Sequence, residues 1–528
     1  MEQSESKIRV VGDLFAEHVI KKPDSEAIVC NKQRITWREY DRQTDRAAQG
    51  LINLGVKRGD RVGIYIPSWP EFLFVYLGAV KIGATAVPVS WRFTPDEIKF
   101  VINNAGASVL VMSAGYKDMN MVKNLEAVRD GLPTLKHVVI LEKEKALPGM
   151  IPFEKFMADP TPALAKAKAA VEAEDPVIFI YTSGTTGVPK AAILTHKNLL
   201  AYINWMINIC YVVGENTVLM NAPLNHVGAA VMGVIACLAA GNKLAMMDIF
   251  DPVKTLQFIQ DEKITVIGQV PAMYALELLN PDVEKYDLSS VIVAIVSSAP
   301  CPSELISAIQ KRMGVTPQNA YGLTEVSGAV TCTLIEHGEE KLKHTVGVPQ
   351  AGIELAIMDD DGNILPQGEA GEIAIKGDAV MKGYWQRPDE DAKVFDKKGY
   401  FHTGDMGKLD PDGCLMIVGR KKEMYIRGGE NVYPPEIEEA IARHPDVFLV
   451  AVIGRPDPVM GEVGRAYIIP KPGTNPTAEG IKAFLKDKLV KYKIPEDIIF
   501  RKELPLTPLG KTKKLDLYQE MRKEFSKG

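Results

Sequence analysis

The stretch YTSGTTGVPK, residues 181–190, collects five hydroxyl side chains, two glycines and a closing lysine within ten residues. Hydroxyls, approachable glycine amides and an ammonium group supply many hydrogen-bond donors, which suits the binding of a polyphosphate. The stretch is not a Walker A loop, because Gly184 and Gly187 are three residues apart and Ala191 follows Lys190. It therefore indicates either an anion-binding loop or a polar hairpin loop.

The flanking segments predict how this loop is held. VIFIY before it reads as a buried strand, and AAILT after it alternates like a second strand. We therefore expect the loop to join two strands, whereas a Walker A loop opens a helix.

Five more motifs follow along the chain. They are NHVG at 225–228, YGLTE at 321–325, YFHTGD at 400–405, GRKKEMYIRGGENVYPPEIE at 419–438, and PLGK at 508–511. Together with TSGTTGVPK, and in this order, they resemble the signatures of the adenylate-forming enzymes. That family includes acyl-CoA synthetases, 4-coumarate-CoA ligase, firefly luciferase and nonribosomal peptide adenylation domains. The resemblance extends over nearly the whole chain.

The resemblance implies a site for ATP and for the AMP formed from it. Within it, Tyr321 would stack on the base, Thr324 would bind a phosphate, and Asp405 would accept hydrogen bonds from the ribose. Arg420 would bind the same sugar or a phosphate. The full implied set is Thr182, Ser183, Gly184, Thr185, Thr186, Gly187, Lys190, Ser298, Ala299, Pro300, Ala320, Tyr321, Gly322, Thr324, Asp405, Arg420 and Lys511.

The same resemblance implies catalytic roles for Lys511, Thr182 and Glu325. Glu325 would hold Mg²⁺, which neutralises charge between phosphates during in-line attack. Lys511 would bridge the reacting carboxylate and the α-phosphate, and so stabilise the charge that develops in the transition state.

Sites for the acid and for CoA are also implied. The acyl pocket would include His226, Val227, Val231, Ser297 and Gly322, and the CoA site would include Arg427, Gly428 and Gly429. Relatives often carry a serine where Arg427 stands. In SSAPCP, residues 297–302, Ser298 and Pro300 replace small residues that are common in the family. Lys422 matches the hinge position of the family.

The implied reaction is the formation of an acyl-CoA from a carboxylic acid, ATP and CoA through an acyl-adenylate, with release of AMP and pyrophosphate. The pocket segments 226–231, 269–273 and 297–322 are mostly small or apolar, which favours an uncharged acid: medium-chain fatty, alicyclic or aromatic. An adenylation enzyme that loads a carrier protein is the first alternative. A luciferase-like oxygenase and a nucleotide-binding regulator without catalysis are the others.

Composition narrows the class of protein. The chain of 528 residues is long enough for two or more domains, and 62 basic against 67 acidic residues give no sign of a nucleic-acid partner. The six cysteines lack CxxC spacing, so neither a zinc site nor a disulfide framework is indicated. The start lacks a signal-peptide pattern and no apolar run reaches ~20 residues. We expect a cytoplasmic enzyme without a membrane segment, and consider a homodimer.

The elements that must position these motifs read as an α/β fold. From residue 61, strands and helices alternate, and TPDE at 94–97 predicts a capping box before a helix. After about residue 350, short strands with Asp-Gly turns indicate a small antiparallel subdomain. A run of charge and glycine near 420 predicts a hinge. We therefore expect an N-terminal adenylation domain at 1–420 and a mobile α+β domain with the catalytic lysine at 421–528.

Overall fold

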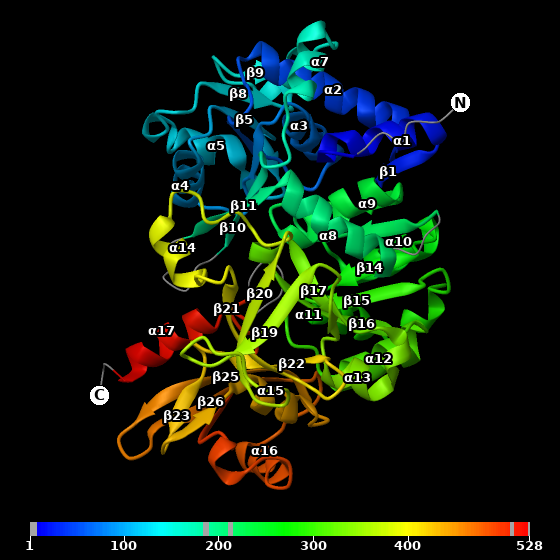
Figure 1. The fold of residues 1–528 in the computed structure, drawn as a ribbon. Coiled ribbons are helices and arrows are strands. Elements are labelled where there is room, and N and C mark those ends of the chain that lie inside the picture. Colours follow the sequence, from blue (N-terminus) through cyan, green and yellow to red (C-terminus); the bar gives the residue numbers. More distant parts are fainter. Residues whose placement is uncertain (1–7, 183–188, 210–214, 507–511, 526–528) are drawn as a thin grey trace.

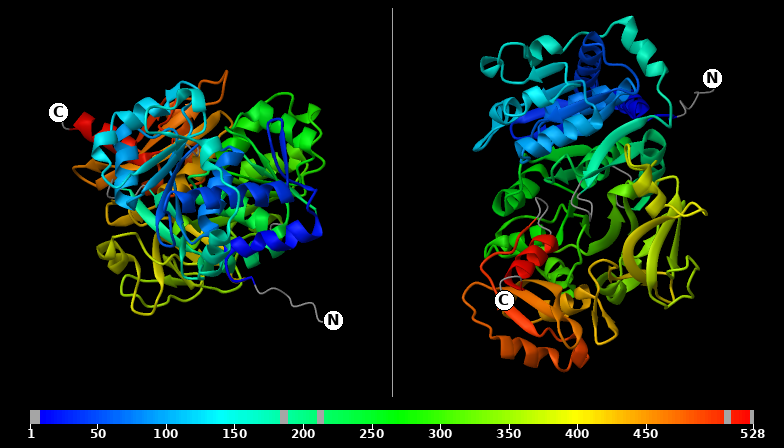
Figure 2. Two further views of the ribbon diagram at one scale, coloured as in Figure 1. Left: turned by 90° about the horizontal axis from the view of Figure 1, so that it is seen from above. Right: turned by 90° about the vertical axis from the view of Figure 1, so that its left-hand side faces the viewer.

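The computed structural model describes residues 8–182, 189–209, 215–506 and 512–525. The chain forms two large, mainly parallel sheets covered by helices, then a small antiparallel sheet, then a C-terminal α+β unit (Figure 1). The predicted α/β fold class is confirmed. In the side view of Figure 2, the C-terminal unit (orange to red) lies at the opposite end of the molecule from the first large sheet.

The first large sheet has seven strands. In sheet order they are β11 (Lys190–Thr195), β10 (Pro176–Thr182), β4 (Thr85–Pro88), β3 (Arg61–Tyr65), β5 (Val109–Met112), β8 (His137–Ile140) and β9 (Ile151–Pro152). Neighbouring strands run parallel except at β11, which is antiparallel to β10, and Thr182 is the register partner of Lys190. The prediction that the hydroxyl-rich loop joins two strands is confirmed.

Helices α2 (Trp37–Asn53), α3 (Pro70–Lys81) and α4 (Pro95–Ala105) accompany this sheet. The predicted capping box opens α4: Thr94 Oγ1 accepts a hydrogen bond from the Glu97 amide at 3.4 Å, and Glu97 accepts one from the Thr94 amide at 2.8 Å. These bonds satisfy two of the amides that a helix start leaves without intrahelical partners.

The second large sheet has nine strands. In sheet order they are β18 (Val348–Pro349), β17 (Gly328–Cys332), β16 (Pro317–Leu323), β15 (Val293–Ser297), β14 (Val266–Gln269), β12 (Thr217–Met220), β13 (Lys243–Met246), β1 (Glu26–Cys30) and β2 (Gln33–Thr36). The strands from β16 to β1 are parallel. Their carboxyl ends therefore open on one edge, where α/β sheets commonly bind ligands.

Two apolar cores cover the faces of this sheet. On one face, Ile267 packs with apolar residues of α10 (Pro252–Glu262), α11 (Pro271–Leu278) and α12 (Ser303–Met313). On the other face, Val266 belongs to the core that also contains Val231 and Val234. Successive strand residues point to opposite faces, so each position of β14 can be assigned to one core.

The glycine-rich apolar segment after the NHVG motif forms a helix, but not a regular one. Gly228–Ile235, labelled η4, is a π-helix, and it continues as the α-helix α9 (Ala236–Ala240). A π-turn widens the helix by one residue per hydrogen bond and is frequently found at functional sites. The sequence indicates only a helix here, and the widened turn is a difference that the structure adds.

The small antiparallel sheet consists of β19 (Ile353–Met358), β20 (Gly371–Gly377), β21 (Phe401–Leu409) and β22 (Leu415–Arg420). Between β20 and β21, the chain returns to the first large sheet and runs along β11. The Trp385 amide donates to the Ala191 carbonyl at 2.9 Å, the Ile193 amide donates to the Gly383 carbonyl at 3.0 Å, and Ala192 bridges to Tyr384. This segment thus covers the edge strand of the seven-stranded sheet.

The C-terminal unit contains β23 (Tyr425–Arg427), β24 (Glu430–Val432), β25 (Val447–Asp457), β26 (Gly461–Pro470) and β27 (Asp497–Phe500). Its helices are α15 (Pro434–Ala442), α16 (Ala478–Leu485) and α17 (Lys514–Phe525). Among the described helices, none is long and apolar enough to cross a membrane.

Candidate active site

Three residues expected to bind the nucleotide meet where the nine-stranded sheet faces the small antiparallel sheet. Tyr321 lies near the end of β16, and its hydroxyl donates to Asp405 Oδ2 at 2.8 Å. Asp405 on β21 is the register partner of Arg420 on β22, whose Nε lies 2.9 Å from Asp405 Oδ1. The two contacts fix the orientation of the Asp405 carboxylate, which is only 4% exposed.

Electrostatic interactions and burial shift the pKa values of two members of this cluster. The Asp405 carboxylate raises the pKa of Arg420, and burial beside Asp405 raises the pKa of Tyr321 far above its usual value. Tyr321 is therefore a neutral phenol and Arg420 is a cation at every physiological pH. The three residues offer an aromatic ring, a carboxylate and a guanidinium, the groups that a nucleotide needs for its base, ribose and phosphate.

Glu325 lies in the short turn η6 (Thr324–Val326) directly after β16. Its Oε1 accepts a hydrogen bond of 2.8 Å from the Tyr384 hydroxyl, and its carbonyl accepts one of 2.7 Å from the Met381 amide. Burial raises the pKa of Glu325, while the bond from Tyr384 works in the opposite direction. Both contacts come from the segment that covers β11.

The carboxylate oxygens of Glu325 are suitable ligands for a magnesium ion that a substrate also binds. Mg²⁺ in phosphate-transfer enzymes is commonly held by one or two carboxylates together with substrate phosphates. Among the described residues, no group of three or more His, Cys, Asp and Glu side chains could hold a metal ion by itself. A single oriented carboxylate is compatible with the shared arrangement, and the Mg²⁺ role of Glu325 remains a prediction.

The ends of the hydroxyl-rich loop are described, and residues 183–188 lie outside the described part of the chain. Thr182 Oγ1 donates to the Lys190 carbonyl at 3.5 Å. The Lys190 ammonium, 8% exposed, forms a buried ion pair with Glu390 and lies 5.2 Å from the centroid of the Tyr384 ring. Lys190 lowers the pKa of Glu390 to about 2. The phosphate contacts of this loop remain a prediction.

Tyr384 and Glu390 contact predicted site residues, and sequence reasoning missed both. Both belong to GYWQRPDE at 383–390, between the small-sheet strands and the YFHTGD motif. The signal was an aromatic pair after a glycine and before a proline-started helix, α14 (Pro388–Val394). It was overlooked because the partners of these residues, Glu325 and Lys190, are far away in the sequence.

The segment expected beside the adenine follows β15. Ser297 is the register partner of Ala320, so this segment and the end of β16 are adjacent. Ser298 has a φ of 75°, a left-handed conformation that favours glycine. Strained backbone of this kind clusters at ligand sites, and Ala299 and Pro300 follow Ser298 directly in the chain. Their contacts with a base remain a prediction.

The residues expected in the acyl pocket differ in exposure. His226 is half-buried, and its Nδ1 accepts a hydrogen bond of 3.1 Å from the Gly228 amide. Val227 is 4% exposed and Val231 is fully buried in the core. At Gly322, an added Cβ would lie 1.8 Å from the Gly328 carbonyl oxygen, so this glycine allows close approach of two strands. The assignment of these residues to the pocket remains a prediction.

Gly268, on β14 of the nine-stranded sheet, borders open space. It is exposed, although Ile267 and Gln269 on either side are buried. Among the described residues, no atom of another residue beyond its chain neighbours lies within 4 Å of the position that a Cβ would take. Alternation puts Gly268 on the face of Val266 and η4, and Gln269 on the opposite face, where it donates to Glu277 at 2.7 Å. The predicted wall at 269–273 therefore begins with a side chain that faces α11.

The residues expected to bind CoA form the turn between β23 and β24. Gly428 and Gly429 have φ values of 61° and 92°, as a tight two-residue hairpin requires. Arg427 is engaged within the C-terminal unit: it donates to the carbonyls of Tyr492 and Ile494 at 3.1 and 2.9 Å and pairs with Glu496 at 3.0 Å. A contact of Arg427 with CoA remains a prediction, and the guanidinium already has these three partners.

The hinge and tail residues are described in part. Lys422 follows the end of β22 and is exposed, whereas Lys511 lies outside the described residues. The described residues nearest to Lys511 form the base of its loop, where Leu506 and Thr512 pair in an antiparallel bridge.

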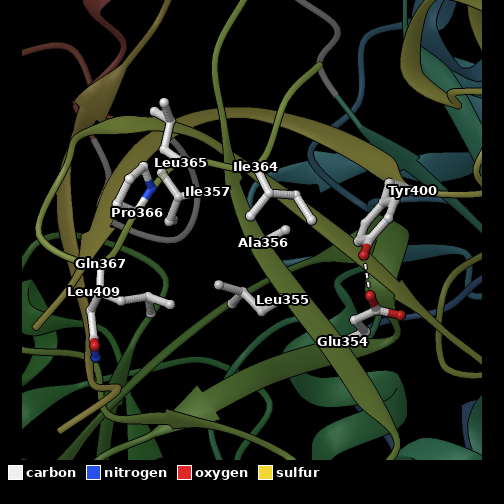
Figure 3. A pocket seen from close by; sticks show the side chains of 10 residues that line it. All are labelled: Glu354, Leu355, Ala356, Ile357, Ile364, Leu365, Pro366, Gln367, Tyr400 and Leu409. Carbon is white, nitrogen blue, oxygen red and sulfur yellow. Dashed lines mark hydrogen bonds between the residues drawn. The ribbon is translucent and has the colours of Figure 1, made fainter. Parts of the chain in front are cut away.

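Figure 3 shows a groove of about 330 Å³ on the small antiparallel sheet. It is lined by Glu354, Leu355, Ala356, Ile357, Ile364, Leu365, Pro366, Gln367, Tyr400 and Leu409. None of these belongs to the predicted site, and the Tyr400 hydroxyl already donates to Glu354 inside it. The groove is thus separate from the cluster around Asp405.

Comparison with known proteins agrees with the fold and identifies the family. Residues 15–385 match the AMP-binding enzyme family, and residues 436–511 match the AMP-binding enzyme C-terminal domain. The chain belongs to the AMP-binding enzymes, the adenylate-forming superfamily. Its activity is that of an acid-thiol ligase, an AMP-forming acyl-CoA synthetase, for which ATP and CoA are substrates.

Named relatives cover almost the whole chain. A feruloyl-CoA synthase of Amycolatopsis sp is 34% identical over 95% of this chain and 96% of its own. A long-chain-fatty-acid–CoA ligase of Bacillus subtilis (strain 168) is 31% identical over 97% of this chain and 94% of its own. The solved structure of the anthranilate CoA ligase AuaEII with anthranoyl-AMP has a TM-score of 0.88 at 25% identity, and 99% of each chain is covered.

Proposed function

We propose that the chain makes an acyl-CoA from an uncharged carboxylic acid with a bulky apolar body, in two half-reactions. In the first, a carboxylate oxygen attacks the α-phosphorus of ATP, the bond to the β-phosphate oxygen breaks, and pyrophosphate leaves. In the second, the CoA sulfur attacks the carbonyl of the acyl-adenylate and AMP leaves. The observation that carries this proposal is the cluster of Tyr321, Asp405 and Arg420 next to Glu325.

Each group in this cluster has a distinct task in the first half-reaction. Tyr321 and Asp405 would hold the base and the ribose, so that the α-phosphate is presented in one orientation. Glu325, oriented by Tyr384, would hold Mg²⁺ against the phosphates. The ion would neutralise charge on the departing pyrophosphate. The loop at 182–190 would supply hydroxyl and amide donors to the same group.

Lys511 would act in the first half-reaction alone. An ammonium between the carboxylate and the α-phosphate stabilises charge that exists only in the transition state, which is the efficient use of an electrostatic group. We further propose domains at 1–420 and 421–528 that rotate about Lys422. This rotation would withdraw Lys511 and bring the turn of Gly428 and Gly429 to the thiol of CoA.

The open space beside Gly268 supports the bulky acid. Ile295, the register partner of Gly268, lies two residues before Ser297, which corresponds to roughly 7 Å along a strand. An acyl chain that begins near Ser297 and runs along the sheet would extend toward the open space beside Gly268. Relatives act on acids as different as ferulate and long-chain fatty acids, so overall identity does not decide between them.

The proposal is tested by AMP and pyrophosphate release with a panel of acids, from acetate to octanoate, cyclohexanecarboxylate and cinnamate. Lys511→Ala should reduce acyl-adenylate formation about 100- to 1,000-fold. It should leave thioester formation from supplied acyl-adenylate within a few-fold. Lys513→Ala, two residues along the same tail, is the matched control and should keep both rates. Equal loss of both half-reactions in Lys511→Ala would contradict the assignment.

The same assay separates the alternatives. A carrier-loading enzyme would transfer the acyl group to a phosphopantetheinylated carrier protein and leave CoA unused. A regulator without catalysis would bind ATP and release no pyrophosphate with any acid in the panel.

A further inference from the structure

Lys514, the first residue of α17, is held by two carboxylates in the C-terminal unit. Its Nζ lies 2.9 Å from Glu423 Oε2 and 2.8 Å from Glu438 Oε1. The side chains of all three residues are largely buried, at 15%, 27% and 16% exposure respectively. Burial alone would lower the pKa of Lys514, but the two carboxylates outweigh it and raise the pKa. The two carboxylates therefore favour the charged form of the lysine.

The two carboxylates connect Lys514 to different parts of the unit. Glu423 directly follows Lys422, and its amide donates to the Arg420 carbonyl at 3.0 Å, so it belongs to the segment that leaves the small sheet. Glu438 lies on α15 and also accepts a hydrogen bond of 2.7 Å from the Val452 amide of β25. Lys514 thus joins the hinge segment, α15 and the tail helix at one point.

The base of the loop that carries Lys511 is built next to this point. Leu506 and Thr512 form an antiparallel bridge, and the Lys513 amide donates to the Pro505 carbonyl at 2.7 Å. Beyond it, Leu517 of α17 is fully buried against the core of β25 and β26. Lys514 therefore fixes the chain directly after this bridge, at the point where α17 begins.

We propose that Lys514 is a positioning residue for adenylation: it clamps the base of the Lys511 loop to Glu423 and Glu438, so that the tail moves with the hinge segment as one body. This inference rests on the proposed role of Lys511. A catalytic charge misplaced by about 1 Å loses much of its effect, so a loose base would slow the step that uses Lys511. It would spare the step that does not.

The physical consequence of removing the lysine is larger than the loss of one contact. Lys514→Met leaves two partly buried carboxylates close together without a counter-charge, and like charges at short range repel. Lys514→Arg keeps the charge and can contact both carboxylates through its forked guanidinium. A simple packing role for the side chain would be kept by methionine, whereas a clamp would be restored only by arginine.

The experiment measures both half-reactions in the full-length enzyme with its preferred acid. Lys514→Met should slow acyl-adenylate formation about 10- to 100-fold with little change in the KM for ATP. Thioester formation from supplied acyl-adenylate should stay within threefold. Lys514→Arg should recover adenylation to within threefold, and Lys513→Met is the control for a neighbouring exposed lysine. Glu423→Gln is the milder variant, because it leaves the contact between Lys514 and Glu438 in place. It should show the same selective loss of adenylation to a smaller extent.

A double variant decides whether Lys514 acts through Lys511. In the Lys511→Ala background, Lys514→Met should cause no further loss of adenylation, because the charge that it positions is already gone. A further loss of tenfold or more would overturn the proposal. A Lys514→Met variant with wild-type rates would also overturn the proposal. So would a Lys514→Met variant that slows both half-reactions to the same extent. If Lys511→Ala itself keeps adenylation, the proposed role of Lys511 fails first, and that outcome is seen without any Lys514 variant.

Discussion

Gly268 and Gly322 are both glycines of the nine-stranded sheet, but they are required for different reasons. At Gly322 an added Cβ meets the Gly328 carbonyl at 1.8 Å, which is backbone that cannot move aside cheaply. At Gly268 the same atom would enter open space. The first glycine therefore serves the packing of β16 against β17, whereas the second borders open space.

This contrast gives a prediction for acid selectivity. Gly268→Leu should lower kcat/KM for bulky acids at least tenfold, because one misplaced methylene in an apolar pocket already costs about 1–3 kcal/mol. Activity on acetate or propionate should stay within threefold. The measurement is kcat/KM over the acid panel.

Gly322→Ala tests the packing role of the other glycine. Its clash should lower stability by about 1–3 kcal/mol and reduce activity on every acid alike. If the wild type is active and Gly268→Leu shows the same acid selectivity, the acyl pocket does not lie at Gly268. The proposed two-step reaction would be unaffected by that result.

At the scale of elements, helix α11 carries a buried acid against β14. Glu277 is fully buried, accepts one hydrogen bond from Gln269, and its Oε2 has no hydrogen-bond partner among the described residues. Burial raises its pKa from an ordinary value of 4.5 to about 8. The folded state therefore holds the proton more tightly than the unfolded state, so this group destabilises the fold as pH rises from about 4.5 to about 8.

The size of this effect follows from linkage. Each pH unit in that window costs about 1.4 kcal/mol of stability for a fully shifted group. Glu277→Gln cannot ionise and keeps the bond with Gln269. Its apparent Tm should therefore fall less than that of wild type between pH 6 and pH 8. Glu284→Gln, at an exposed acid nearby, should behave like wild type. Thermal unfolding that is equally pH-dependent in Glu277→Gln and wild type would contradict the buried proton.

Sequence reasoning succeeded where a feature depends on neighbours in the chain. The capping box at Thr94 and the strands on either side of the loop at 183–188 are local patterns, and both appear as expected. It failed where partners are distant: Tyr384 bonds to Glu325, 59 residues earlier, and Lys190 pairs with a carboxylate 200 residues later. It also missed the face of Gln269, because the phase of a short buried strand cannot be read from its own residues.

At the scale of the whole molecule, one ion pair and one histidine–carboxylate contact among the described residues connect the helices of the nine-stranded sheet with the C-terminal unit. Arg443, the residue after α15, lies 3.5 Å from Glu304 of α12, and Glu439 lies 4.0 Å from His344 at the end of α13 (Gly338–His344). The Arg443 and Glu304 side chains are 38% and 50% exposed. Such pairs contribute at most about 1 kcal/mol, so they hold this arrangement without locking it.

We predict that removing the stronger pair redistributes the half-reactions. Glu304→Gln removes the ion pair with Arg443 and so weakens the arrangement of the C-terminal unit against α12 that the structure shows. The half-reaction that uses this arrangement should slow, and the other half-reaction should become faster. Each change should be about fivefold or less. Rates of both half-reactions in 0.05 and 1 M salt provide the check, because screening at high salt should remove most of the difference. Changes in the same direction for both rates would show that the pair has another role.

The segment that covers β11 also affects how the chain can be made. Residues 383–385 complete the edge of a sheet whose other strands end at Thr195, so nearly 190 residues separate the edge from its cover. During synthesis, the free side of β11 therefore waits with unpaired peptide groups while β12 to β18 of the nine-stranded sheet emerge, and an open edge is a template for pairing with another chain. The segment that orients Glu325 thus also ends the period in which a nascent chain is prone to aggregate.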